Sequence, residues 1–129
     1  MTATGSPADL VDEFIRRICA KDLEGACELV TADVEYDNVP MGKNIGPEGI
    51  KALLGPMIDG IDEVVFEVHR QVASGNLVMN ERSDKFRVGE RWIDLPVMGV
   101  FHVADGKISL WRDYFDARDF ETQLAAAMA

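Results

Sequence analysis

The stretch LVMNERSDKFRVGERWIDLPVMGVFHVADGKISLWRDYF, residues 77–115, decides the fold class. It contains three runs rich in β-branched and aromatic residues, which predict strands at Leu77–Val88, Trp92–Ala104 and Lys107–Phe115. The connections between them, GER at 89–91 and DG at 105–106, are short, and an Asp-Gly pair is a strong hairpin signal. Because long strands joined by such short turns must be antiparallel, this stretch predicts a strand meander.

Working outward, a short strand is predicted at residues 33–39, and a fourth long strand at Glu63–Val72 is followed by the turn residues at 74–76. Apolar residues spaced three and four apart indicate helices before and after the meander. The expected helices begin at Pro7 with Ser6 as N-cap, span Leu23–Val30, run from Gly46 to about Ile58, and run from about Arg118 to Ala127. Helices followed by a meander predict an α+β fold, with helices packed on one face of a curved, mostly antiparallel sheet.

Composition limits the function classes. The 129 residues are 47% hydrophobic and 28% charged, which predicts one globular domain over residues 1–129, with 1–5 disordered. Acidic residues outnumber basic ones by 23 to 13, giving a net charge of −10, the opposite sign to that of a nucleic-acid or anionic-membrane binder. With neither a signal-peptide pattern nor a long apolar run, a cytoplasmic location is expected.

Common metal and nucleophile motifs are missing from the sequence. Cys19 and Cys27 are eight apart without a CxxC pattern, so buried free thiols are expected rather than a disulfide. His69 and His102 are far apart and are expected to face outward, so no metal site is predicted. The chain has no nucleophile elbow, phosphate-binding loop or dinucleotide-binding glycine pattern.

Strand alternation places polar residues beside bulky apolar ones. In the strand at 77–88, Asn80, Arg82 and Asp84 share one face and lie between Val78 and Phe86. By itself, the Arg82–Asp84 pair fits an ion pair at the surface.

Two other predicted strands have the same character. Tyr36 and Asn38 share a face in the strand at 33–39, and Trp111, Asp113 and Phe115 share a face in the last strand. Taken singly, Tyr36 fits a core ring with its hydroxyl at the surface, and Asp113 fits a solvated residue or a partner of the last helix. If all these faces are concave, however, two carboxylates, a guanidinium, a phenol and amides converge in an apolar cavity.

Such a cluster has an electrostatic consequence. Two ionised carboxylates and one Arg would leave a net negative charge in a medium of low dielectric constant, which is costly. One carboxyl is therefore expected to hold a proton, with a raised pKa, while the other stays ionised. A neutral acid and an ionised base in one cavity suit concerted acid–base chemistry without a covalent intermediate.

Three runs and one triplet resemble the limonene epoxide hydrolase family. They are NERSD at 80–84, LPVMGVFHV at 95–103 and DGKISLWRDYFD at 105–116, together with YDN at 36–38, where Tyr36 precedes Arg82 by 46 residues. The resemblance covers roughly residues 7–123. It implies the cone-shaped fold of the nuclear-transport-factor-2-like, or SnoaL-like, superfamily, with three to four helices on the concave side of the sheet.

The resemblance also implies a role for each polar residue. Asp113 would take a proton from water, and Tyr36 and Asn38 would hold that water. Asp84 would be the protonated acid that donates to the epoxide oxygen, and Arg82 would bridge the two aspartates. No cofactor or metal is needed in this chemistry, and Asn80 and Ser83 lie outside the family's five residues.

An apolar pocket is expected around these groups, from family position and strand alternation together. Its predicted lining consists of Met57, Phe66, Phe86, Leu95, Val97, Phe115 and Phe120. The hairpin at 87–91 looks short compared with that of typical relatives. Because loops at a pocket edge influence what fits, the natural epoxide, its regiochemistry and its enantiopreference are not predicted.

The leading hypothesis is a cofactor-independent epoxide hydrolase that adds water to an apolar epoxide and gives a vicinal diol. One alternative is a steroid isomerase or polyketide cyclase of the same fold, although such an enzyme has no need of an Arg between two carboxylates. Another alternative is a non-catalytic domain that binds apolar ligands. A homodimer is expected through the convex sheet face, which would expose some of Trp92, Met98, Val100 and Val103.

Overall fold

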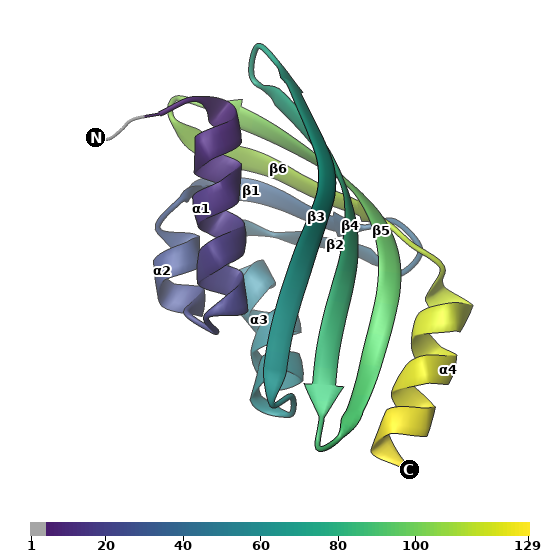
Figure 1. Ribbon diagram of the computed structural model, residues 1–129. Coiled ribbons are helices and arrows are strands. Elements are labelled where there is room, and N and C mark those ends of the chain that lie inside the picture. The colour runs from purple at the N-terminus through teal and green to yellow at the C-terminus, as the bar shows by residue number, and fades with distance from the viewer. Residues whose placement is uncertain (1–4) are drawn as a thin grey trace.

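The computed structural model describes residues 5–129, so the first four of the five residues predicted to be disordered lie outside the described part of the chain. The described residues form four helices and six strands (Figure 1). In chain order they are α1 (Pro7–Cys19), α2 (Leu23–Cys27), β1 (Val30–Asn38), β2 (Gly42–Ile45), α3 (Gly46–Asp59), β3 (Glu63–Ser74), β4 (Leu77–Val88), β5 (Arg91–Ala104), β6 (Lys107–Tyr114) and α4 (Ala117–Met128).

All six strands belong to one sheet in the order β2-β1-β6-β5-β4-β3. The meander β3-β4-β5-β6 is antiparallel throughout, whereas β1 pairs with β6 in parallel. The long strands curve strongly, and α1 and α3 lie on the inner side of that curve, while α4 stands against β5 (Figure 1). The predicted α+β fold with a curved, mostly antiparallel sheet is thus confirmed.

Helix α1 closes one side of the core. Ser6 accepts a hydrogen bond from the backbone N–H of Asp9, and the Asp9 side chain accepts one from the backbone of Ser6, which forms a capping box. The apolar face of α1 is buried, and the Phe14 ring meets Trp111 of β6 edge-on, with 5.1 Å between ring centroids. Full burial of one such side chain stabilises the fold by roughly 1.5–3 kcal/mol.

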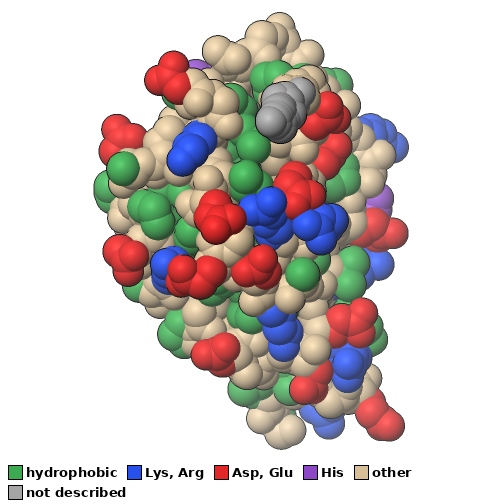
Figure 2. Space-filling view, turned by 90° about the vertical axis from the view of Figure 1, so that its left-hand side faces the viewer, with side chains coloured by type: hydrophobic (Ala, Val, Ile, Leu, Met, Phe, Trp, Pro, Cys, Tyr) green, Lys and Arg blue, Asp and Glu red, His purple; other side chains and the backbone are tan. Residues whose placement is uncertain are grey.

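The outer side of α1 is charged. Glu13 pairs with Arg16 at 2.6 Å and with Arg17 at 2.7 Å. Figure 2, which views the molecule from this side, shows acidic and basic side chains intermingled rather than gathered by sign. Among the described residues, no helix is long and apolar enough to cross a membrane.

Helix α2 is shorter than predicted and ends at Cys27 rather than Val30. The carbonyl of Leu29 accepts a hydrogen bond of 2.8 Å from the backbone of Ile108, so the chain is already pairing with β6 where the helix was expected to continue. The hairpin partner of β1, strand β2, was not predicted at all. It has only four residues, and Gly42, with φ of 116°, opens it after a tight turn.

The parallel pairing of β1 with β6 positions much of the site. In its register, Tyr36 lies beside Trp111 and Asn38 lies beside Asp113. On the opposite face of the same two strands, Arg112 bonds Asp37 at 2.9 Å and Glu35 at 2.7 Å. These charge-assisted bonds join the two strands at the level where the site residues meet.

The remaining single-residue expectations have mixed outcomes. His69 and His102 are exposed as predicted. Cys19 and Cys27 are free thiols but only half-buried, and Cys19 Sγ accepts a bond from a backbone N–H of β3 at 3.2 Å. Val103 was one of the four residues considered for the convex face of the sheet, but it is buried. It has the same strand parity as the buried Phe101, so it lies on the inner face.

Candidate active site

Arg82 is the centre of the polar cluster, and its side chain is fully shielded from solvent. Its Nε and Nη2 donate to the two carboxylate oxygens of Asp84, each at 2.9 Å. Nη2 also donates to Asp113 Oδ2 at 2.8 Å, and Nη1 donates to Asn80 Oδ1 at 2.9 Å. An isolated surface ion pair between Arg82 and Asp84 is therefore excluded, because one buried guanidinium connects three side chains.

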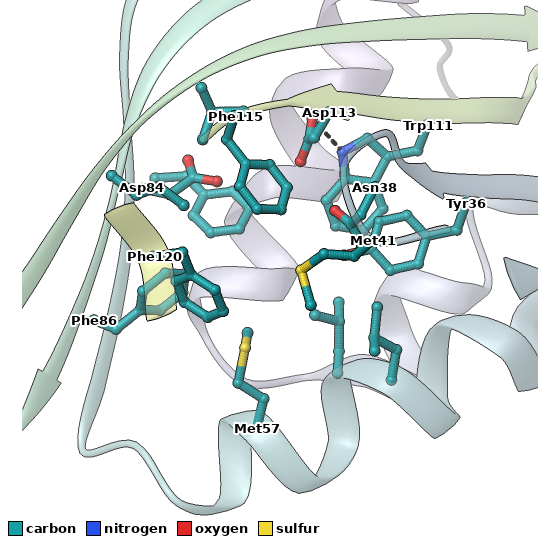
Figure 3. A pocket seen from close by; sticks show the side chains of 15 residues that line it. Tyr36, Asn38, Met41, Met57, Asp84, Phe86, Trp111, Asp113, Phe115 and Phe120 are labelled. Carbon is teal, nitrogen blue, oxygen red and sulfur yellow. Dashed lines mark hydrogen bonds between the residues drawn. The ribbon is translucent and has the colours of Figure 1, made fainter. Parts of the chain in front are cut away.

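Asp113 has a second donor that the sequence analysis did not assign. Trp111 Nε1 donates to Asp113 Oδ1 at 3.0 Å, so each carboxylate oxygen has its own partner (Figure 3). The same indole stacks on the Tyr36 ring, with centroids 4.2 Å apart. A signal existed in the sequence, since Trp111 shares a strand face with Asp113 and a buried indole N–H requires an acceptor.

Gly99 of β5 was also missed. A Cβ at this position would lie 2.3 Å from Arg82 Nη1 and 2.9 Å from both Asn80 Oδ1 and Asp113 Oδ1. The polar cluster thus occupies the space where any other side chain would project. A glycine inside a strand often marks such a close approach, which was the available signal.

An apolar cavity borders the two aspartates (Figure 3). Tyr36, Asn38, Asp84 and Asp113 line it, whereas Arg82 lies behind the aspartates and does not. All seven residues predicted to line a pocket lie in its wall: Met57, Phe66, Phe86, Leu95, Val97, Phe115 and Phe120. Met41, Leu53, Leu54 and Trp111 complete the lining. Met41 was missed because it belongs to the turn before the unpredicted strand β2.

Burial and charge affect the acids of this cluster differently. Burial raises the pKa of Asp84 to about 6; the Arg82 guanidinium opposes this rise, and the charge of Asp113 adds to it. Burial works against the charged form of Arg82, but the two carboxylates more than compensate, so its pKa lies above the ordinary value. The Tyr36 pKa is raised, mainly by burial and then by Asp113, so the phenol is neutral. The raised pKa of Asp84 agrees with the expectation that one carboxyl of the cluster holds a proton. The protonated form of Asp84 is the major one below about pH 6.

Both aspartates present free lone pairs to the cavity. Arg82 occupies one lone-pair direction on each oxygen of Asp84, which leaves the other directions for a proton or a ligand. Tyr36 and Asn38 border the same space from β1. Among residues 5–129, no group of three or more His, Cys, Asp or Glu side chains is placed to hold a metal ion. The arrangement can accept a proton on one side and donate one on the other.

Comparison with known proteins agrees with this geometry. The sequence matches the family described as "Limonene-1,2-epoxide hydrolase catalytic domain" over residues 5–126. The chain belongs to the limonene-1,2-epoxide hydrolase family. It is 34% identical over 109 residues to epoxide hydrolase EphG of Mycobacterium tuberculosis, an alignment that covers 84% of this chain and 72% of that protein.

Solved structures place this family member within a wider fold group. An LEH-like epoxide hydrolase from M. tuberculosis superposes with a TM-score of 0.81 at 30% identity, covering 95% of this chain and 91% of that one. A protein of Shewanella denitrificans described as a SnoaL-like polyketide cyclase has a TM-score of 0.82 at 17% identity, covering 93% and 97%. TerC, crystallised with polyporic acid, has a TM-score of 0.81 at 19% identity, covering 93% and 99%. Identities this low show the shared fold alone.

Proposed function

We propose that this member of the limonene-1,2-epoxide hydrolase family is a cofactor-independent epoxide hydrolase that adds water to an apolar epoxide and releases a vicinal diol. The observation that carries the proposal is the contact of one buried Arg82 with both Asp84 and Asp113 at the wall of an apolar cavity. The strain of the three-membered ring supplies driving force, and the basic alkoxide that forms on opening requires an acid close by.

Asp113 serves as the general base in this proposal. Its two oxygens are anchored by Trp111 and Arg82, and the carboxylate faces the cavity beside Asn38 and Tyr36. A water held by these three groups gives its proton to Asp113 as its oxygen forms a bond to one ring carbon. Each Asp113 oxygen already accepts one hydrogen bond, which weakens the carboxylate as a nucleophile toward carbon but leaves a lone pair for the proton of the water.

Asp84 serves as the general acid. The bond between the attacked carbon and the ring oxygen breaks, the electron pair moves to that oxygen, and the proton of Asp84 neutralises it. After the step, Asp113 holds a proton and Asp84 is ionised, with Arg82 in contact with both. The diol leaves with the water oxygen, one of the water's protons and the proton from Asp84, so its composition is that of the epoxide plus one water. Return of the proton from Asp113 to Asp84 through solvent restores the starting state.

The rival functions are less compatible with the cluster. An isomerase or cyclase abstracts a proton from carbon and therefore needs a strong base. A guanidinium bonded to both its base and its acid would weaken that base, and the reaction does not require such a group. A domain that only binds apolar ligands has no use for a buried cluster of three ionisable side chains, because removal of a charged group from water costs several kcal/mol. The SnoaL-like neighbours support the fold and not a cyclase activity.

The test is a panel of cyclic, aromatic and long-chain apolar epoxides assayed for diol by mass spectrometry. With the best substrate, a single turnover by excess enzyme in ¹⁸O-labelled water should place the label directly in the diol. Unlabelled diol would mean that a carboxylate attacked carbon, which overturns the direct mechanism. Turnover of none of these epoxides would contradict the proposed activity itself.

A homodimer formed through the outer face of the sheet is the second part of the proposal. Trp92, Met98 and Tyr114 are each exposed by 45–47% on that face, and Val72 by 67%. Met98 and Tyr114 are direct neighbours across β5 and β6, so their apolar surfaces are continuous. A patch of this kind is what an interface between two copies would cover.

A further inference from the structure

A line of hydrogen bonds leaves the polar cluster on the side away from the cavity. Arg82 Nη1 donates to Asn80 Oδ1 at 2.9 Å, and Asn80 Nδ2 donates to Gln71 Oε1 at 3.0 Å. Gln71 Nε2 then donates to Asp12 Oδ1 on α1, also at 3.0 Å. Asn80 is 1% exposed and is not part of the cavity wall, so it cannot contact a ligand bound there.

The chemistry of its two ends gives this line a direction. Arg82 can only donate hydrogen bonds, and the carboxylate of Asp12 can only accept them. Each of the two amides between them has one accepting oxygen and one donating nitrogen. Turning either amide around would place donor against donor at one side and acceptor against acceptor at the other. Asp12 therefore orients Gln71, and Gln71 orients Asn80 so that its oxygen faces Arg82.

A bulge in β3 makes the line possible. The pairing of β3 with β4 shifts between Val68 and Arg70, so Phe66 and Gln71, an even and an odd position, both face inward. Phe66 then pairs with Asp84, and Gln71 pairs with Asn80. Without the extra residue, strand alternation would place Gln71 on the outer face of the sheet.

We propose that Asn80 is a positioning residue for Arg82, and that its orientation is set by Gln71 and Asp12. In this role, Asn80 holds the guanidinium flat against the acid and the base. The inference rests on the proposed function, which gives those two aspartates their roles. Three atoms lie close to the position that a Cβ on Gly99 would take: Arg82 Nη1, Asn80 Oδ1 and Asp113 Oδ1. If Asn80 stops accepting from Nη1, the next acceptor for that nitrogen is the general base, Asp113.

Substitutions at position 71 can separate the orientation of Asn80 from core packing, because the Gln71 side chain is only half-buried. Gln71→Glu, combined with Asp12→Asn to avoid a like-charge pair, still presents an acceptor to Asn80, so kcat should stay within about twofold of wild type. Gln71→Lys presents only donors and should turn Asn80 around. We expect kcat to fall about tenfold to a hundredfold, as on loss of other outer-shell partners, with KM within about twofold.

Two further variants complete the series. Asn80→Ala removes the acceptor itself and should lower kcat at least as far as Gln71→Lys does, again with little change in KM. Ser83→Ala is the matched control, because Ser83 lies on the outer face of the same strand, where it bonds His69, and its loss should leave kcat unchanged. If Gln71→Lys and the double variant Gln71→Glu, Asp12→Asn have the same kcat, the proposal is overturned.

An NMR measurement on the protein without substrate tests this inference independently of the proposed epoxide hydrolase activity. In ¹⁵N-labelled protein, the Arg82 Nε–Hε resonance can be assigned by its loss in Arg82→Lys. Its chemical shift should change in Gln71→Lys and in Asn80→Ala. It should stay the same in the double variant Gln71→Glu, Asp12→Asn. An unchanged resonance in Gln71→Lys would refute the positioning role even in an active enzyme. A protein that opens no epoxide yet shows these displacements would refute the proposed function and retain the role of Asn80.

Discussion

Arg82 on β4 bonds Asp113 on β6 across the strand that lies between them. Neighbouring strands are about 4.8 Å apart, so the side chains of Arg82 and Asp113 together bridge roughly twice that distance over β5. The 2.8 Å bond from Nη2 to Asp113 Oδ2 exists because the residue beneath it is Gly99. One cation is thereby shared by the proposed acid and the proposed base, which lie on strands that do not touch.

Gly99→Ala should therefore damage the site more than the fold. Its φ is not positive, so the backbone accepts alanine, but the added Cβ would lie 2.3 Å from Arg82 Nη1. Overpacking of this kind costs about 1–3 kcal/mol, and the displaced guanidinium should lower kcat/KM by at least about tenfold. Gly55→Ala in α3, where nothing lies within 4 Å, is the control and should keep full activity. Wild-type kinetics in Gly99→Ala would contradict this account of the site.

Arg82→Lys should lose activity and stability together, despite its unchanged charge. A planar guanidinium bonds both oxygens of Asp84 and one of Asp113, whereas an ammonium acts as a point charge. Leaving buried carboxylates poorly paired costs about 3 kcal/mol or more, visible as a lower melting temperature. Arg87→Lys, on the same strand but in a partly exposed pair with Glu63, should change neither quantity. A normal melting temperature and rate in Arg82→Lys would remove Arg82 from its proposed role.

Asp113→Asn should abolish most hydrolysis while the protein stays folded. The substitution is nearly isosteric, but the amide cannot take a proton from water, and loss of a general base commonly costs ~10²–10⁴-fold. The diol assay measures the rate, and circular dichroism checks the fold. Asp94→Asn, an exposed position on β5, serves as the control. More than about a tenth of the wild-type rate in Asp113→Asn would exclude the base role.

Asp84 should make both activity and stability depend on pH. Its pKa of about 6 lies above the ordinary value of 3.8, so the folded state holds a proton that the unfolded state releases. The resulting stabilisation is fully present below about pH 4 and is lost as the pH rises through about 6. The unfolding free energy of wild type minus that of Asp84→Asn should therefore fall between these pH values, as measured by urea denaturation.

The activity profile follows from the same group, because the proposed acid must be protonated to act. The kcat of the wild-type enzyme should decline as the pH rises through about 6. A difference in unfolding free energy that stays constant or rises over the same range would contradict the raised pKa. A kcat that increases steadily above pH 6 would instead contradict the role of Asp84 as acid.

The apolar outer face should make the protein a dimer in solution. At micromolar concentration, light scattering should report twice the chain mass of 14.3 kDa. Met98→Glu, in the middle of the exposed patch and directly beside Tyr114, should shift the protein toward monomers by placing a charge in the interface. A single monomeric mass for the wild-type protein would defeat the proposed interface.

Much of the fold follows from local sequence alone. The long strands are recognisable because their side chains alternate and their turns are short, and β4 has the predicted bounds, Leu77–Val88. The same alternation puts Asn80, Arg82 and Asp84 on one face, and the structure buries all three. A period of two residues is a property of the strand backbone, so these relationships need no knowledge of the rest of the chain.

Only the tertiary structure decided that β1 lies beside β6, and in what register the two strands pair. The parallel pairing that brings Tyr36 to Trp111 joins segments 75 residues apart, as with Asn38 and Asp113. Two further features depend on the same nonlocal packing: the bulge that turns Gln71 inward, and the passage of the Arg82 side chain over Gly99 toward β6. Alternation in the sequence predicts which residues share a face of one strand. The register between distant strands determines which of those faces meet. That register is set by the whole core and by ion pairs such as Arg112–Asp37.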